Sequence, residues 1–194
     1  MGKYIIALTG ASGVIYGIEL ARQLLERGIQ IHLIASEPAC IVLEQELGWC
    51  FLKTAGETFK SYLPYNNLIV YDNNDIAARI ASGSFLTDGM IVIPCTMASV
   101  AAIAHGNARS LIERAADVML KEKRPLIIVP RETPLNAIHL RNMLILAEMG
   151  VSIIPAMPAF YNRPRSVDEM VAFMVGKILD AIHIEHDLFT RYDN

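Results

Sequence analysis

Tyr4-Ile5-Ile6-Ala7-Leu8-Thr9-Gly10-Ala11-Ser12-Gly13 decides the fold, because it joins a short apolar run to a glycine-rich loop. Continuous apolar runs of this length are typical of strands that are buried on both faces of a sheet. Residues 14–27 then place apolar side chains at helical spacing, and Gly28 suits the position after a helix C-terminus. The order of strand, glycine-rich loop and helix predicts the first βα unit of an α/β domain.

The same alternation continues along the chain without an internal repeat or a linker. We expect strands at residues 4–8, 29–35, 68–71, 90–93, 126–129 and 151–154, and helices at 14–27, 38–47, 99–105, 111–121, 135–149 and 167–182. Pro94, Pro130 and Pro155 are expected to end their strands, and Ser166 with Glu169 to form a capping box. The pattern predicts a single domain over residues 1–194, built on a doubly wound, mostly parallel sheet flanked by helices in a Rossmann-like arrangement.

The composition indicates a soluble protein with an excess of apolar side chains. The chain is 53% hydrophobic and 19% charged, against roughly 45–50% and about 25% in typical soluble domains. One domain of this size does not bury so many apolar groups, so we expect a homo-oligomer. The 17 Lys and Arg against 20 Asp and Glu give a net charge of −3, which argues against nucleic-acid binding.

The cysteines and the N-terminal sequence favour the cytoplasm. Cys40, Cys50 and Cys95 are odd in number and form no CxxC pair, as expected of free thiols in a reducing compartment. We find no signal-peptide pattern, and no apolar run reaches the roughly 20 residues that a membrane helix needs. The five histidines show no metal-ligand spacing, so we expect no metal site.

Four loops that follow strands are expected to meet at one site, because ligands of open α/β sheets bind beyond the carboxyl ends of the strands. The loops are residues 9–13, 36–38, 94–97 and 130–134. In the first loop, Gly10, Gly13 and Gly17 match neither the dinucleotide-binding spacing nor the Walker spacing. By itself it fits either a turn that approaches a ligand or a plain βα turn capped by Ser12.

Charged residues supply further candidates, each with an alternative. Arg131 and Glu132 lie between two prolines, where a rigid backbone suits a phosphate ligand, although they also fit a surface ion pair. Arg114 and Lys121 lie seven residues apart on one predicted helix and suit a basic site or a solvated face.

Two other positions are less distinctive. Glu44 and Glu46 cannot share a face of their helix, so we expect one of them to point into solvent. Cys95 follows a strand and is interpreted as a small buried residue rather than a nucleophile.

Taken together, seven segments resemble the flavin prenyltransferases, the UbiX-like family that includes small subunits associated with phenolic-acid decarboxylases. They occur in order and span nearly the whole chain, and residues 48–80 match least. The segments are T-G-A-S-G at 9–13, A-S-G-S at 81–84, M-I-V-I-P-C at 90–95, E-R-A-A-D-V-x-L-K-E at 113–122, V-P-R-E-T-P at 129–134, I-H-L-R-N-M at 138–143 and P-A-F-Y-N-R-P at 158–164.

The resemblance implies a metal-independent prenyl transfer. Reduced flavin mononucleotide (FMN) would accept a dimethylallyl group from dimethylallyl phosphate, first at nitrogen-5 and then by ring closure at carbon-6. The product, prenylated FMN, would serve a UbiD-type decarboxylase as partner. The family is commonly a dodecamer with sites completed between subunits. The sequence leaves open which pathway is served and whether a phosphate or a diphosphate donor is preferred.

The resemblance also implies roles for matching residues. It assigns FMN binding to Gly10, Ala11, Ser12, Ser36, Thr96, Met97, Ala98, Ser99 and Arg131. It assigns binding of the prenyl phosphate to Lys121, Arg131, Glu132 and Tyr161. Ser82 and Arg114 would line the same region. It assigns catalytic roles to Ser12, Glu46, Lys121 and Glu132. Glu132 would donate a proton to the leaving group, and Glu46 would act near carbon-6 of the flavin. Lys177 and Tyr192, the remaining implied substrate contacts, stand where many members have Arg and Trp.

Two rival functions remain. The first is a flavin-dependent decarboxylase of peptidyl-cysteine or phosphopantothenoylcysteine, which would need a substrate motif that we do not find. The second is a subunit that only stores FMN or hands it to a decarboxylase. A store has no use for a second phosphate pocket, so the residues implied to hold the prenyl phosphate argue against it.

Overall fold

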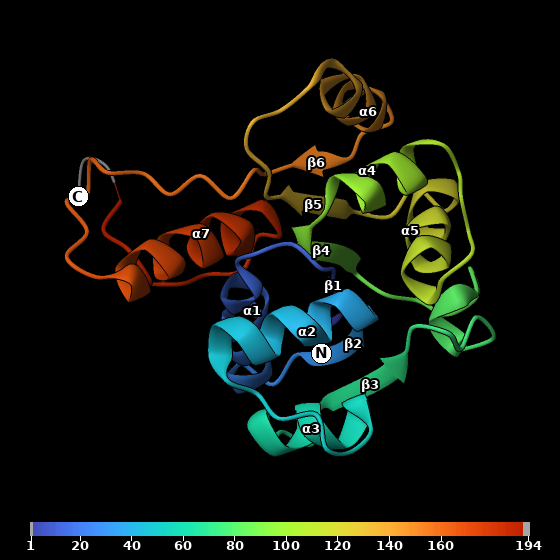
Figure 1. The fold of residues 1–194 in the computed structure, drawn as a ribbon, viewed down its shortest axis with the longest axis horizontal. Coiled ribbons are helices and arrows are strands. Elements are labelled where there is room, and N and C mark those ends of the chain that lie inside the picture. The colour runs from blue at the N-terminus through green and yellow to red at the C-terminus, as the bar shows by residue number, and fades with distance from the viewer. Residues whose placement is uncertain (1, 192–194) are drawn as a thin grey trace.

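The computed structural model describes residues 2–191, and within them the strands form one six-stranded sheet in the order β3-β2-β1-β4-β5-β6. Every strand pair is parallel. The strands are β1 (Lys3–Leu8), β2 (Gln30–Ala35), β3 (Leu68–Asp72), β4 (Gly89–Cys95), β5 (Leu126–Pro130) and β6 (Ser152–Ile153). The predicted doubly wound α/β fold is therefore confirmed (Figure 1).

Helices cover both faces of this sheet, so its central strands are apolar on both sides. Along β1, Ile6 and Leu8 belong to one buried cluster, whereas Ile5 and Ala7 belong to the other. The first cluster is closed by α1 (Val14–Glu26), α2 (Glu37–Leu47), α3 (Ala55–Tyr62) and α7 (Val167–Ala181). The second is closed by η1 (Arg79–Ala81), α4 (Met97–Ala104), α5 (Leu111–Lys121) and α6 (Ala137–Glu148).

The order of the strands places a topological switch point between β1 and β4. The chain leaves β1 toward β2 on one side, and β4 occupies the other side of β1. The connections that follow β1 and β4 therefore diverge to opposite faces, which opens a crevice beyond their carboxyl ends. This crevice is the place where the sheet positions a ligand site.

Several boundaries differ from the sequence-based expectation. β4 and β5 continue through Pro94 and Pro130, which were expected to end them. Pro94 is tolerated because the pairing of β4 with β5 is irregular between Val92 and Cys95, and Pro130 is the last residue of β5. α4 begins at Met97, two residues early, because the Thr96 side chain accepts the Ser99 amide and caps the helix.

Two capping arrangements also correct the prediction. The unassigned segment before β3 contains α3, which begins with a complete capping box between Thr54 and Glu57. At α7, Ser166 accepts the amide of Glu169 at 3.2 Å. The Glu169 carboxylate, however, accepts the amide of Arg165, so the expected reciprocal box is only half formed.

Across residues 2–191, no helix is long and apolar enough to span a bilayer.

Candidate functional site

The loop after β1 begins α1 with a glycine, and an acid from another helix supplies the cap. Gly13 has a left-handed φ of 94° and no side-chain cap within its own segment. Instead the Glu46 carboxylate, at the end of α2, accepts the Gly13 amide at 2.9 and 3.1 Å and the Val14 amide at 3.2 Å. Of the two alternatives for this loop, the plain turn capped by Ser12 is therefore not observed, and the exposed Ser12 side chain remains available to a ligand.

The loops after β1 and β2 pack directly against each other. A Cβ atom at Gly10 would lie 2.4 Å from Cβ of Pro38, so only glycine fits this close approach. The Ser36 amide donates to the carbonyl of Leu8 at 3.0 Å, and the Ser36 hydroxyl caps α2 by accepting the Ala39 amide at 3.3 Å.

Thr9 joins the ends of β1 and β4, although no sequence pattern singled it out. Its hydroxyl donates to the Pro94 carbonyl and accepts the Thr96 amide, both at 2.8 Å. The side chain is almost fully buried, with 3% exposure, so neither partner has water as a substitute. The hydroxyl therefore fixes the two loops on either side of the switch point in one register.

The N-terminus of α4 brings donors to the same crevice. The Thr96 and Ser99 hydroxyls lie 3.0 Å apart, and Thr96 also accepts the Ser99 amide. Met97 is buried and Ala98 is exposed at the first helical turn. Free amides and the positive end of the helix dipole favour an anionic group at such a position.

Arg131 completes the meeting of the four loops. Its backbone amide donates to the Cys95 carbonyl at 3.3 Å, and its Nε donates to the Ser12 carbonyl at 3.2 Å across 119 residues of sequence. Glu132 instead accepts the neighbouring Thr133 amide at 3.0 Å. The alternative of an Arg131–Glu132 ion pair is not observed, because the ion pairs of the described residues involve other side chains.

Tyr16 feels the charges of both Arg131 and Glu46. Burial raises the pKa of its hydroxyl most, the Arg131 guanidinium lowers it, and the Glu46 carboxylate raises it. Both charges therefore act on one half-buried ring beside the first loop.

A second group of implied residues lies apart from this crevice. Lys121 is exposed at the C-terminal end of α5, which leads into the first residue of β5, whereas Arg131 follows the last residue of β5. A strand rises about 3.3 Å per residue, so five residues separate the two positions by roughly 16 Å. One chain therefore does not bring Lys121 to Arg131.

Ser82 and Arg114 lie near different ends of α5. Ser82 precedes Gly83, which lies against Glu122 next to Lys121, whereas the first residue of α5 donates to the Asn73 carbonyl just beyond β3. Arg114 lies in the first turns of α5, and its Nε is buried without a hydrogen-bond partner among the described residues. The Ser82 hydroxyl lies 2.8 Å from that of Ser84. The ion pairs of the described chain include neither Arg114 nor Lys121.

A third group lies on α7 and the segment before it. That segment leaves the sheet beside Arg131, because the Ala156 amide donates to the Pro130 carbonyl at 3.0 Å. Tyr161 is half exposed and packs edge-on against Phe173, with 6.0 Å between ring centroids. Lys177 is exposed on α7. Tyr192 lies outside the described residues.

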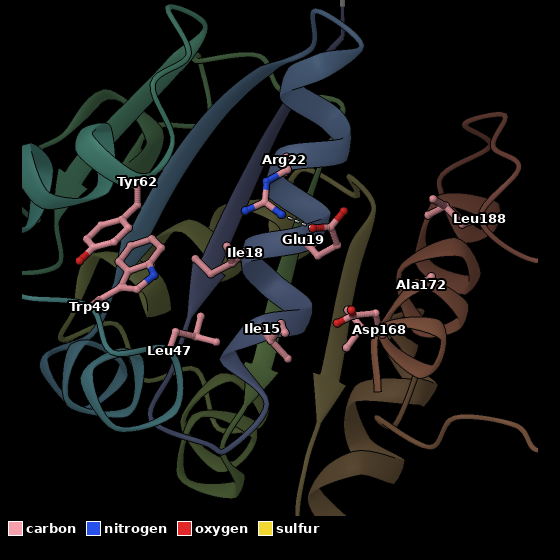
Figure 2. A pocket seen from close by; sticks show the side chains of 11 residues that line it. Ile15, Ile18, Glu19, Arg22, Leu47, Trp49, Tyr62, Asp168, Ala172 and Leu188 are labelled. Atoms are coloured by element: carbon pink, nitrogen blue, oxygen red, sulfur yellow. Dashed lines mark hydrogen bonds and ion pairs between the residues drawn. The ribbon is translucent and has the colours of Figure 1, made fainter. Parts of the chain in front are cut away.

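Two cavities flank α2, and one of them adjoins the crevice. It holds about 560 Å³ beyond the carboxyl ends of β2 and β3 and is lined by Ser36, Pro38 and Tyr71 among others. The other, of about 600 Å³, lies between α1 and α7 and is walled by a stacked Trp49–Tyr62 pair (Figure 2). None of the residues implied by the family resemblance lines this second cavity.

Cys95 does not act as a nucleophile in this site. It is fully buried, and burial raises the pKa of its thiol to about 12. Among residues 2–191 no cluster of His, Cys, Asp and Glu side chains is arranged to hold a metal ion.

Comparison with known proteins identifies the class of this fold and crevice. A family model described as Flavoprotein matches residues 2–182, nearly the whole described chain. The protein is thus a flavoprotein by family.

Individual relatives narrow the family further. The flavin prenyltransferase UbiX of Alkalihalophilus pseudofirmus is 48% identical over 193 residues, which cover 96% of this chain and 94% of that protein. This chain therefore belongs to the flavin prenyltransferase family.

Two solved structures share the fold over its whole length. A dodecameric FMN-dependent UbiX-like decarboxylase from Escherichia coli O157:H7 has a TM-score of 0.89 at 43% identity, covering 99% of this chain and 100% of that one. AnUbiX (PadA1), solved in complex with FMN and dimethylallyl pyrophosphate, has a TM-score of 0.89 at 38% identity, covering 100% and 98%.

Proposed function

We propose that this protein transfers a dimethylallyl group from dimethylallyl phosphate to reduced FMN, and so makes prenylated FMN for a UbiD-type decarboxylase. The observation that carries the proposal is the meeting of the Ser12 loop, the α4 N-terminus and Arg131 at the switch point of the sheet. The resemblance of the whole chain to a flavin prenyltransferase at 48% identity supports the same reaction.

The residues of the crevice fit FMN chemically. Its phosphate is a dianion, and the hydroxyls of Thr96 and Ser99 at the positive end of α4 are the donors that such a group requires. Gly10 and Ala11 offer backbone close to the ring, and Ser36 stands at the edge of the neighbouring cavity. Arg131 adds a fixed positive charge, and bound FMN supplies the nucleophilic ring that accepts the prenyl group.

The leaving phosphate requires donors of its own. Arg131 is held by Ser12 through Nε, so the other guanidinium nitrogens can face an anion. Glu132 is exposed beside it, and we assign it the proton that the departing phosphate takes up. Charge develops on the phosphate as its carbon–oxygen bond breaks, and preorganised donors stabilise that charge most in a dry pocket.

Lys121 can contact the leaving phosphate only if it comes from another subunit. Roughly 16 Å of β5 separates Lys121 from Arg131 within one chain, and Arg114 has a buried Nε without a partner. We therefore propose a homo-oligomer, with a dodecamer as in the Escherichia coli relative, in which Lys121 of a neighbouring copy reaches the phosphate. Tyr161 and Lys177 are assigned to the same substrate region.

Glu46 and Ser12 are assigned to the flavin side of the reaction. Ring closure at carbon-6 releases a proton, and a carboxylate near the ring can accept it. The Glu46 carboxylate, held by the amides of Gly13 and Val14, is a fixed acceptor at the start of α1. Ser12 is exposed next to it and can hydrogen-bond to the reacting edge of the flavin.

The proposal includes the cytoplasm as the place of action. Three cysteines without a disulfide among them support a reducing compartment.

A coupled reaction tests the function. The protein is incubated anaerobically with reduced FMN and dimethylallyl phosphate, and the protein-free filtrate is added to a cofactor-free UbiD-type decarboxylase. Decarboxylation that depends on both substrates supports the proposal. A filtrate that activates the decarboxylase no better than FMN alone contradicts it, and favours an FMN store. A parallel reaction with dimethylallyl diphosphate decides which donor is preferred.

A further inference from the structure

The segment that follows α7 turns back and lies close against that helix. We call residues 182–191, the last coloured stretch of chain in Figure 1, the tail. A Cβ atom at Gly176 would lie 2.5 Å from Cε1 of Phe189 and 2.7 Å from Cε1 of His186, so glycine leaves room for the tail. Glycine weakens the interior of a helix, and the close approach of the tail gives a physical reason for its presence in α7.

One carboxylate of α7, that of Asp180, binds the tail at two points. Its Oδ1 lies 3.1 Å from Nε2 of His186, whose side chain is fully buried. The other ring nitrogen of His186, Nδ1, accepts the Leu188 amide at 3.2 Å, so the ring is neutral and carries its proton on Nε2. The Arg191 guanidinium donates to both oxygens of the same carboxylate, at 2.6 and 3.3 Å. Asp180 therefore holds the middle and the end of the tail.

The tail brings Phe189 into a row of aromatic rings that leads to Tyr161. The ring centroids of Phe189 and Phe173 lie 5.0 Å apart, and those of Phe173 and Tyr161 lie 6.0 Å apart with an interplanar angle of 86°. Both separations lie in the range in which aromatic pairs attract each other. A cavity of about 280 Å³ is lined by the same Phe189 and Phe173 and by Asn162, next to Tyr161. The tail and the Tyr161 segment therefore pack around one aromatic centre on α7.

We propose that Asp180 is a positioning residue for the prenyl-phosphate site: it keeps the tail on α7, so that Phe189 and Phe173 hold the ring of Tyr161. The proposal rests on the proposed function, because Tyr161 is assigned there to the substrate region. Asp180 acts through these rings, and its effect should therefore be seen in substrate binding.

The ion pair of Asp180 is too exposed to serve mainly as a stabiliser of the fold. The side chains of Arg191 and Asp180 are 49% and 25% exposed, and exposed ion pairs contribute little to stability in water. A matched pair stands on α1, where Arg22 and Glu19 are 43% and 23% exposed. That pair lines the second cavity, away from the implied site residues, so it provides a control of equal exposure.

Two variants break the contact between the tail and α7. Arg191→Gln removes the charge and leaves Asp180 to His186, whereas Asp180→Asn keeps an oxygen that accepts from His186. Prenyl transfer is measured against the concentration of dimethylallyl phosphate, with reduced FMN saturating. In both variants we expect KM for dimethylallyl phosphate to rise about fivefold or more and kcat to change less than about twofold, because a misplaced Tyr161 binds substrate and transition state equally poorly. Arg22→Gln should keep the wild-type KM.

The aromatic row is tested by Phe189→Ala and by hydrogen exchange. Phe189→Ala should raise KM as Arg191→Gln does, and the double variant should be no worse than Phe189→Ala alone, because the two residues act through one chain of contacts. Hydrogen exchange is followed by mass spectrometry on peptides that cover residues 157–164 and 184–191. Both peptides should exchange faster in Arg191→Gln than in the wild type, and neither should change in Arg22→Gln.

Three outcomes overturn the proposal: a wild-type KM in Arg191→Gln and Asp180→Asn, an equal rise of KM in Arg22→Gln, or unchanged exchange of residues 157–164 in Arg191→Gln. A wild type that makes no prenylated flavin refutes the proposed function instead. The exchange comparison then decides alone whether Asp180 holds the Tyr161 segment in place.

Discussion

The carboxylate of Glu46 accepts the amide of Gly13 across 33 residues of sequence, and so caps a helix that has no cap of its own. This contact ties the end of α2 to the first loop of the site. An acid at a helix N-terminus is stabilised by the dipole as well as by the amides. The same carboxylate is therefore a structural cap, and it is also the base that we propose for the flavin.

Glu46→Gln separates these two roles. The amide oxygen still accepts one hydrogen bond, so we expect the free energy of unfolding to fall by less than about 1 kcal/mol. We expect prenyl transfer to fall by about 10²-fold or more, because glutamine cannot take up a proton. Chemical denaturation and single-turnover transfer measure the two effects. Unchanged transfer would leave Glu46 as a cap only.

Thr9→Val should loosen the crevice without changing its shape. Valine lacks the hydroxyl that accepts the Thr96 amide, and that donor is then left without its partner. We expect a loss of about 1–3 kcal/mol in the free energy of unfolding, together with weaker FMN binding. Thr9→Ser keeps the hydroxyl and is the matched control. If valine and serine bind FMN equally well, Thr9 does not position the two loops.

The stability of the protein should decrease in acid because of His32. This side chain is fully buried against Phe85, and it shares a hydrogen bond of 2.9 Å with Tyr71. Burial, followed by the charges of Lys3 and Arg79, lowers its pKa to about 4 from an ordinary value of 6.5.

In the unfolded chain, His32 therefore becomes protonated below pH 6.5, whereas in the folded protein it becomes protonated only near pH 4. As the pH is lowered through this interval, the free energy of unfolding should fall by at most about 3 kcal/mol because of His32. Above pH 6.5 this group should cause no change in the free energy of unfolding. Urea titrations at pH 7, 5.5 and 4.5 give the free energy of unfolding at each pH. Its decrease with falling pH should be smaller in His32→Phe. Equal slopes in the two proteins would show that another group is responsible.

The cysteines should react in the order of their exposure. Cys50 is exposed, Cys40 is half-buried with a pKa raised by burial and by Glu44 and Glu37, and Cys95 is buried. Iodoacetamide at pH 7.5 should label Cys50 first and Cys95 only after unfolding, because the thiolate is the reactive form. Peptide masses give the order, and labelling of Cys95 in the folded protein would contradict its assignment as a core residue.

Much of the fold could be predicted because its signals are local. Apolar runs such as 90–93 and 126–129, separated by helical spacing, suffice for a parallel sheet, and ligand sites of such sheets lie at the carboxyl ends. The helix α3 could also have been predicted, because Thr54 and Glu57 have the spacing of a capping box at its N-terminus.

The site could be predicted only in part, because its decisive contacts join distant segments. Spacing on α2 separated Glu44 from Glu46 but could not tell which one turns back toward Gly13. Thr9 stands out only once β1 and β4 are known to be neighbours, 85 residues apart in sequence. The separation of Lys121 from Arg131 likewise depends on which end of β5 each residue occupies.

The mass of the flavin tests the central claim most directly. The protein and its Glu132→Gln variant are each mixed anaerobically with reduced FMN and dimethylallyl phosphate, and the flavin is isolated and weighed by mass spectrometry over time. We predict that the wild type adds one five-carbon unit to FMN, and that the variant binds FMN equally but adds the unit about 10²–10⁴-fold more slowly. Unmodified FMN with the wild type would contradict the account.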